Sequence, residues 1–91
     1  MLKEIHCRVS GRVQLVMFRD FTTRKARGLG LTGTVQNKDD GTVEVVAQGE
    51  EEKLKKLIIK LHKGSLLSRV DSVSVDWITP TQTFHFFNIL Y

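Results

Sequence analysis

The stretch Gly11-Arg12-Val13-Gln14-Leu15-Val16-Met17-Phe18-Arg19 decides how this chain is organised. Residues 5–10, which precede it, alternate apolar and polar side chains as a half-buried β-strand does. Their apolar members, expected on the inner face, are Ile5, Cys7 and Val9. From Phe18 onward apolar residues recur at helical spacing as far as Leu29, with glycines to end the helix. The stretch is therefore predicted to be a turn that leads from a strand into a helix.

A turn at the start of a helix is a place where anions bind. The N–H groups of a tight turn and of a helix's first turn lack acceptors and converge, so the main chain can hold a phosphate. Arg19 supports this interpretation, because a cation in the first turn opposes the helix dipole by roughly 0.3 to 1 kcal/mol. A bound anion explains Arg19 better than helix stability does. The alternative is an ordinary surface arginine.

A hairpin and a second helix are expected next. Residues 34–36 and 42–48 are rich in β-branched side chains, and residues 37–41 join them with Asp-Gly at the end. Three glutamates at positions 50–52 then precede an apolar stripe that ends before Gly64. Acidic residues at the start and a glycine after the end are typical of a helix.

The end of the chain is predicted to be β-structure. Residues 72–77 alternate polar and apolar side chains, residues 83–91 form a β-rich run, and Pro80 lies between them. The order β-α-β-β-α-β predicts an α+β ferredoxin-like fold, a split βαβ sandwich with two helices on one face of an antiparallel sheet. A single domain is expected over residues 1–91.

The charge suits anionic ligands in general. The 91 residues include 14 Lys and Arg against 10 Asp and Glu, for a net charge of +4. Nucleic acid is not thereby implied, because six of the basic residues fall between Lys53 and Arg69, where a solvated helix face accounts for them. An RNA-binding sheet would also need exposed aromatic side chains on its central strands. The outward positions here are His6, Arg8, Ser10 and Glu44.

Cys7 is the only cysteine, which excludes an intrachain disulfide and a cysteine cluster for zinc. We expect it to be a small buried hydrophobe. The first twenty residues hold no apolar run typical of a signal peptide, and no 18 consecutive apolar residues could span a bilayer. These observations predict a soluble cytoplasmic protein that does not associate with a membrane.

The remaining ionisable residues do not form a catalytic or metal-binding set. His6, His62 and His85 fall on different elements without the spacing of metal ligands, so we expect structural roles for them. Asp39 and Asp40 are better explained by turn chemistry than as a pair of catalytic carboxylates. Neither a metal nor a cofactor is expected.

Two segments together resemble the acylphosphatase family. Residues 11–19 are similar to its G-R-V-Q-G-V-x-[FY]-R loop, and residues 33–44 are similar to its G-x-V-x-N-x-x-D-G-x-V-E hairpin. The resemblance extends over nearly the whole chain, including the aromatic-rich last strand. Two motifs in the right order are far more specific than either alone.

The resemblance implies hydrolysis of the mixed anhydride of a carboxylic acid and phosphate. It assigns phosphate binding to Arg19 and orientation of the attacking water to Asn37, which taken alone would be a turn residue. It also implies a small-molecule acyl phosphate as substrate and inorganic phosphate as product. We expect a monomer, although no motif in the sequence addresses the oligomeric state. The loop residues whose N–H groups would bind the phosphate are Gln14, Leu15, Val16, Met17 and Phe18.

Two positions depart from the family pattern. Thr34 replaces a tryptophan, which affects packing, and Leu15 replaces a glycine in the phosphate loop. If the backbone at Leu15 needs a positive φ, leucine costs on the order of 1 to 2 kcal/mol there. The alternative function is therefore a catalytically weakened module of the same fold that binds phosphate or carbamoyl phosphate.

Overall fold

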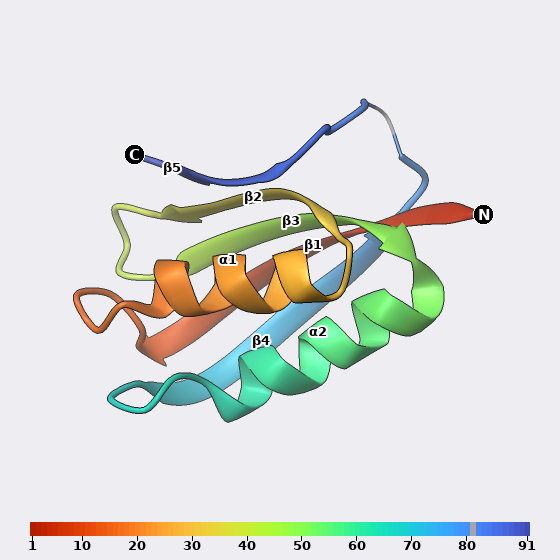
Figure 1. The fold of residues 1–91 in the computed structure, drawn as a ribbon. Helices are drawn as coiled ribbons and strands as arrows, with labels where there is room; N and C mark the ends of the chain where they lie inside the picture. Colours follow the sequence, from red (N-terminus) through yellow and green to blue (C-terminus); the bar gives the residue numbers. More distant parts are fainter. Residues whose placement is uncertain (81) are drawn as a thin grey trace.

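The computed structural model describes residues 1–80 and 82–91 and places two helices on one face of a five-stranded sheet (Figure 1). The strands lie in the order β4-β1-β3-β2-β5. In chain order the elements are β1 (Leu2–Arg12), α1 (Phe18–Gly28), β2 (Thr32–Asn37), β3 (Val43–Glu50), α2 (Glu51–Lys63), β4 (Arg69–Ile78) and β5 (Phe87–Leu90). The predicted ferredoxin-like α+β fold is confirmed.

The sequence predicts an antiparallel sheet, but the sheet is mixed. β1 is antiparallel to β3 and β4, and β2 is antiparallel to β3, but β5 runs parallel to β2. The chain leaves β4 at the end of the sheet where β2 begins and crosses to the far edge before it pairs. It therefore enters β5 in the same direction as β2. Because part of the 83–91 run serves this crossing, only Phe87–Leu90 forms a strand.

The core lies between the sheet and the helices. The apolar side chains of β1 alternate toward the helices as predicted, and Leu54, Leu57 and Leu61 form the buried stripe of α2. Full burial of a leucine contributes about 1.5 to 3 kcal/mol relative to its exposure, so this stripe holds α2 firmly on the sheet. Among the described residues, no helix is long and apolar enough to cross a membrane.

One end of the molecule gathers three segments that are far apart in the sequence. The loop after β1, the β2–β3 hairpin and the C-terminal end of β5 all lie there (Figure 1). Gly11 lies at a β-bulge near the end of β1, just before the loop, with φ of 123°. A Cβ at this position would lie 2.2 Å from the carbonyl oxygen of Arg69, so only glycine fits. The bulge turns the chain toward the other two segments.

Candidate functional site

The loop between β1 and α1 is held in a strained, curved shape. Its flanking residues Val13 and Phe18 are buried, whereas Leu15 and Met17 have left-handed backbones, with φ of 61° and 59°. Such a conformation costs a residue with a side chain roughly 1 to 2 kcal/mol. The carbonyl of Val16, between them, accepts a hydrogen bond from Ser65 Oγ at 3.4 Å. Left-handed residues that alternate with a right-handed one turn successive N–H groups toward a common concave side. Concave backbone of this type is a usual place for anions to bind.

The start of α1 adds further N–H donors. Met17 is the N-cap, and the first backbone hydrogen bond of the helix joins the Phe21 N–H to the Met17 carbonyl at 3.0 Å. The N–H groups of residues 18–20 therefore have no acceptor within the helix, and the positive end of the helix dipole lies among them. Loop and helix together present main-chain donors of the kind that suits an anion.

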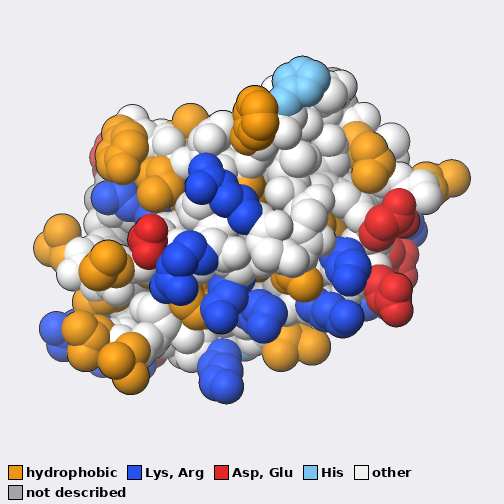
Figure 2. All heavy atoms as spheres, in the orientation of Figure 1, with side chains coloured by type: hydrophobic (Ala, Val, Ile, Leu, Met, Phe, Trp, Pro, Cys, Tyr) orange, Lys and Arg blue, Asp and Glu red, His pale blue; other side chains and the backbone are white. Residues whose placement is uncertain are grey.

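Arg19 brings a full positive charge to this surface. Its side chain is half-buried in the first turn of α1, and among the described residues no carboxylate lies within ion-pair distance of it. The neighbouring Asp20 is paired instead with Arg24, whose Nε lies 3.1 Å from Asp20 Oδ2. The guanidinium of Arg19 thus keeps its charge and its donors for a ligand. Lys and Arg side chains also gather over the two helices (Figure 2), which favours the approach of anions.

Asn37 faces the same space from the last position of β2. Its Oδ1 is buried and has no hydrogen-bond partner among the described residues. A buried acceptor without a donor costs about 1 to 3 kcal/mol, so such atoms are usually satisfied by a water or a ligand. Asn37 therefore brings an uncharged amide, with one acceptor that none of the described residues satisfies, to the edge of the cleft beside the loop.

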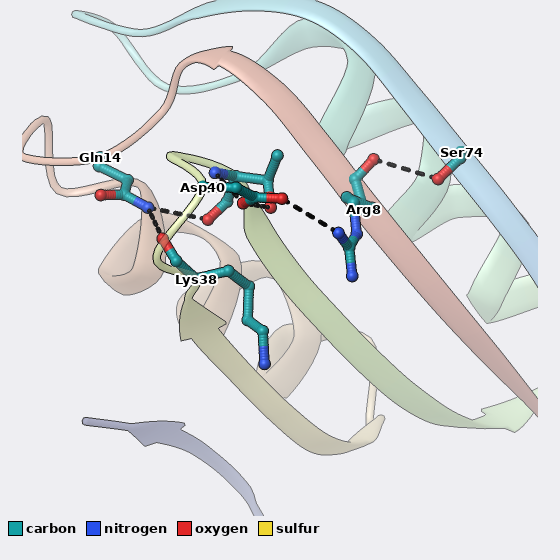
Figure 3. Close-up of polar contacts among 6 residues, drawn as sticks. Arg8, Gln14, Lys38, Asp40 and Ser74 are labelled. Atoms are coloured by element: carbon teal, nitrogen blue, oxygen red, sulfur yellow. Dashed lines mark hydrogen bonds and ion pairs between the residues drawn. The ribbon is translucent and has the colours of Figure 1, made fainter.

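Gln14 connects the loop to the hairpin that carries Asn37 (Figure 3). Its Nε2 donates to the carbonyl of Lys38 at 2.8 Å and to the carbonyl of Thr42 at 2.9 Å. The Lys38 N–H in turn donates to the Thr42 carbonyl at 2.8 Å. Because Lys38 directly follows Asn37, these bonds set the position of the amide relative to the loop.

The tip of the hairpin is organised by Asp40. Its Oδ1 accepts from the Thr42 hydroxyl at 2.6 Å and from the Thr42 N–H at 3.0 Å, and its Oδ2 lies 3.2 Å from Arg8 Nη1 (Figure 3). The hydrogen bonds from Thr42, followed by the charge of Arg8, hold the pKa of Asp40 below its usual value. Asp40 is therefore an ionised turn residue, as the sequence predicted, and not a proton donor.

These groups surround a cleft of about 390 Å³. Five of the predicted site residues line it, namely Leu15, Met17, Phe18, Arg19 and Asn37. The side chains of the other two lie elsewhere: Gln14 binds the hairpin, and Val16 packs against the core. A larger hollow of about 580 Å³, lined by residues such as Met1 and Trp77, lies at the other end of the molecule, away from the anion-binding loop.

Sequence reasoning did not name four residues that line the cleft, Val13, Asp20, Ile89 and Tyr91. The last two come from β5 and the residue after it. The aromatic-rich final run was noticed in the sequence, but nothing local in it indicates that β5 lies beside β2. The guanidinium of Arg19 lies over the ring of Tyr91, with Cζ 5.0 Å from the ring centroid.

The histidines and the cysteine lie outside this cleft. His6 Nε2 lies 2.6 Å from Glu4 Oε2, and Cys7 is buried in the core. Burial, and then the charge of Asp76, raise the pKa of the Cys7 thiol to about 12. Within residues 1–80 and 82–91, no three His, Cys, Asp or Glu side chains are grouped so as to hold a metal ion. The charged and amide side chains that line the cleft are those of Arg19, Asn37 and Asp20, and Asp20 is paired with Arg24.

Comparison with known proteins identifies relatives over the full length of the chain. The profile of the family Acylphosphatase matches residues 5–89. An acylphosphatase of Salinibacter ruber is 42% identical over 87 residues, which cover 96% of this chain and 92% of the relative. The crystal structure of acylphosphatase from Bacillus subtilis superposes with a TM-score of 0.95 at 38% identity and covers 100% of both chains. An acylphosphatase structure from Coxiella burnetii has a TM-score of 0.92 at 36% identity, covering 98% of this chain and 93% of the other.

Proposed function

The chain belongs to the acylphosphatase family, enzymes that split acyl phosphates into a carboxylate and inorganic phosphate, and we propose that three groups of the cleft carry this reaction. They are the N–H groups of residues 14–18, the guanidinium of Arg19 and the side-chain amide of Asn37. The observation that carries the proposal is that Arg19 and Asn37, from different elements, line one cleft beside the left-handed loop residues Leu15 and Met17.

The phosphate is held by the loop and by Arg19. Transfer of a phosphoryl group needs neutralisation of charge on the phosphate oxygens more than covalent help from the protein. The main-chain N–H groups supply directed donors, and a guanidinium can meet two phosphate oxygens at once, which an ammonium group cannot do. The absence of a carboxylate partner among the described residues leaves Arg19 free for this role.

Asn37 orients the water that attacks phosphorus. Its side-chain amide hydrogen-bonds the water, but a neutral amide cannot take up the proton. The water oxygen forms the new bond to phosphorus as the bond from phosphorus to the acyl oxygen breaks. The carboxylate leaves with the electron pair of that bond, and the proton of the water passes to an oxygen of the phosphate. The good leaving group makes a protein base unnecessary.

Substitution of Asn37 tests this assignment. In Asn37→Ala we expect kcat for acetyl phosphate to fall by about 10² or more, as when one preorganised donor is lost, while inhibition by inorganic phosphate stays nearly unchanged. Asn88→Ala, at an exposed position of β5, is the matched control and should match the parent. An equal loss of phosphate affinity in Asn37→Ala would make Asn37 a phosphate ligand and contradict its role with water.

Arg19→Lys tests the other half of the assignment. Because lysine keeps the charge but loses the two-point geometry, we expect it to recover little of the phosphate affinity and turnover that Arg19→Ala loses. Near-normal hydrolysis by Arg19→Lys would contradict the role of the guanidinium.

A weakened phosphate- or carbamoyl-phosphate-binding module is the second candidate, and one observation favours it. Leu15 has a φ of 61° where the family pattern has glycine, so the loop carries strain that glycine would not. Release of inorganic phosphate from acetyl phosphate separates the two. Binding of phosphate without turnover would support the module.

We further infer a single domain over residues 1–91, acting as a monomer in the cytoplasm without nucleic-acid partners. One continuous hydrophobic cluster involves both helices and all five strands, which supports a single domain. The lone cysteine is buried and free, which suits a reducing compartment. Arg8, on the open face of the sheet, is engaged by Asp40 and not directed to a nucleic acid. Size-exclusion chromatography with light scattering tests the monomer.

A further inference from the structure

Two large apolar side chains that line the cleft are exposed to solvent. Leu15 is 99% exposed and Met17 is 74% exposed, and both line the cleft that Arg19 and Asn37 share. Single exposed apolar residues are common on proteins and need no explanation. These two are different because each occupies a left-handed backbone position, where a side chain is costly. Strain of this kind is typical of functional sites.

Alternate side chains of the loop face the protein and the solvent. The side chains of Gln14 and Val16 point inward, one to the hairpin and the other to the core. The side chains of Leu15 and Met17 are exposed to solvent, while the N–H groups of the same residues belong to the loop that is proposed to hold the phosphate. If the loop binds the phosphate of a substrate, the side chains of Leu15 and Met17 offer apolar surface to the group that is attached to that phosphate.

The direction of the reaction sets the side of the phosphate on which the acyl group lies. Attacking and leaving oxygens lie in line on opposite sides of phosphorus, so the acyl group leaves on the side away from the water at Asn37. The other described side chains that line the cleft include Leu15, Met17 and Ile89, and Asp20 is the only further charged one besides Arg19. No second cation of the described chain lines the cleft to pair with an anionic acyl group.

We infer that Leu15 and Met17 form a binding surface for the acyl group, and that the preferred substrates are acyl phosphates with an uncharged hydrocarbon acyl group of several carbons. This inference rests on the proposed function. Full burial of one methylene raises affinity about fourfold. Because the surface is open to water on its outer side, we expect about a tenfold higher kcat/KM for hexanoyl phosphate than for acetyl phosphate, which is four methylenes shorter.

Paired substitutions on the full chain test the surface. Leu15→Asn and Met17→Asn, singly and together, replace the apolar side chains with one that tolerates the left-handed backbone, and at position 17 asparagine is also a good N-cap. The matched control is Leu66→Asn, which removes a side chain that is 98% exposed but does not line the cleft. Each protein is assayed with both substrates, with subtraction of spontaneous hydrolysis.

The readout is the ratio of kcat/KM for hexanoyl phosphate to that for acetyl phosphate. Relief of backbone strain affects both substrates alike and cancels in this ratio. We expect the ratio to fall about three- to tenfold in the double variant and to stay unchanged in Leu66→Asn. A ratio near one in the parent, or an unchanged ratio in the double variant, would overturn the inference alone. Absence of turnover with both substrates in the parent would overturn the proposed function and the inference with it.

Discussion

The guanidinium of Arg19 lies against the face of the Tyr91 ring, with Cζ 5.0 Å from the ring centroid. The electron-rich ring attracts the cation. An attraction of this kind needs no N–H donor, so the N–H groups of the guanidinium stay free to donate to a phosphate. The contact therefore limits the orientations of the guanidinium without consuming its donors.

Tyr91→Leu should raise KM for acetyl phosphate about two- to fivefold with a small effect on kcat, because an exposed cation–π contact contributes about 0.5 to 1 kcal/mol. Tyr91→Phe keeps the ring and should remain near the parent. Steady-state kinetics of the two variants measure this. If Tyr91→Phe behaves as Tyr91→Leu does, the hydroxyl group and not the ring is responsible.

Gln14→Leu should lower both stability and kcat. The variant leaves the carbonyls of Lys38 and Thr42 without the side-chain donor of Gln14, which we expect to lower the free energy of unfolding by about 1 to 3 kcal/mol. With the hairpin released from the loop, kcat should fall more than phosphate affinity does. Urea unfolding and inhibition by inorganic phosphate measure the two effects. Gln36→Leu, on β2, is the control, and an equal effect there would show that any lost glutamine has the same consequence.

Leu15→Gly should relieve the strain of the left-handed backbone, which leucine tolerates at a cost of roughly 1 to 2 kcal/mol. Part of this gain is offset by the greater unfolded-state entropy of glycine, of about 0.4 to 1 kcal/mol. We expect unchanged or slightly higher thermal stability and a higher kcat/KM for acetyl phosphate. Leu66→Gly, whose backbone is not left-handed, should only lose stability. If the two variants lose stability equally, strain at Leu15 is absent.

Cys7 should be inert in the folded protein. The thiol is buried and its pKa is about 12, so iodoacetamide at neutral pH should leave both thiol and activity intact until urea unfolds the chain. The same shift affects stability. Between the ordinary thiol pKa of 9.0 and about 12, the unfolded state binds fewer protons than the folded state, so stability falls as pH rises above 9. In Cys7→Ala this alkaline loss should be smaller, as urea unfolding at neutral pH and at pH 10 would measure. Rapid alkylation of the native protein would contradict the burial.

Local patterns in the sequence determined most of the elements and the two halves of the site. The alternation in residues 5–10 and the stripe of Leu54, Leu57 and Leu61 reflect periods of strand and helix that any short segment displays by itself. Arg19 could be named from its place in the first turn of a helix, whereas Asn37 was named only from the resemblance of residues 33–44 to a family motif and stays a prediction. The glycine that the family pattern has at position 15 indicated that the backbone there could need a positive φ, and Leu15 has a φ of 61°.

Only the tertiary structure decided how these parts meet. The parallel entry of β5 depends on which edge of the sheet the chain reaches after β4, and no local period encodes that choice. The contact of Tyr91 with Arg19 follows from it, 72 positions along the chain. Gln14 illustrates the same limit, because the sequence indicated its N–H as a ligand, while its side chain binds carbonyls of a hairpin 24 and 28 residues away. Contacts of this kind arise from the register and packing of distant strands, and those are properties of the whole fold.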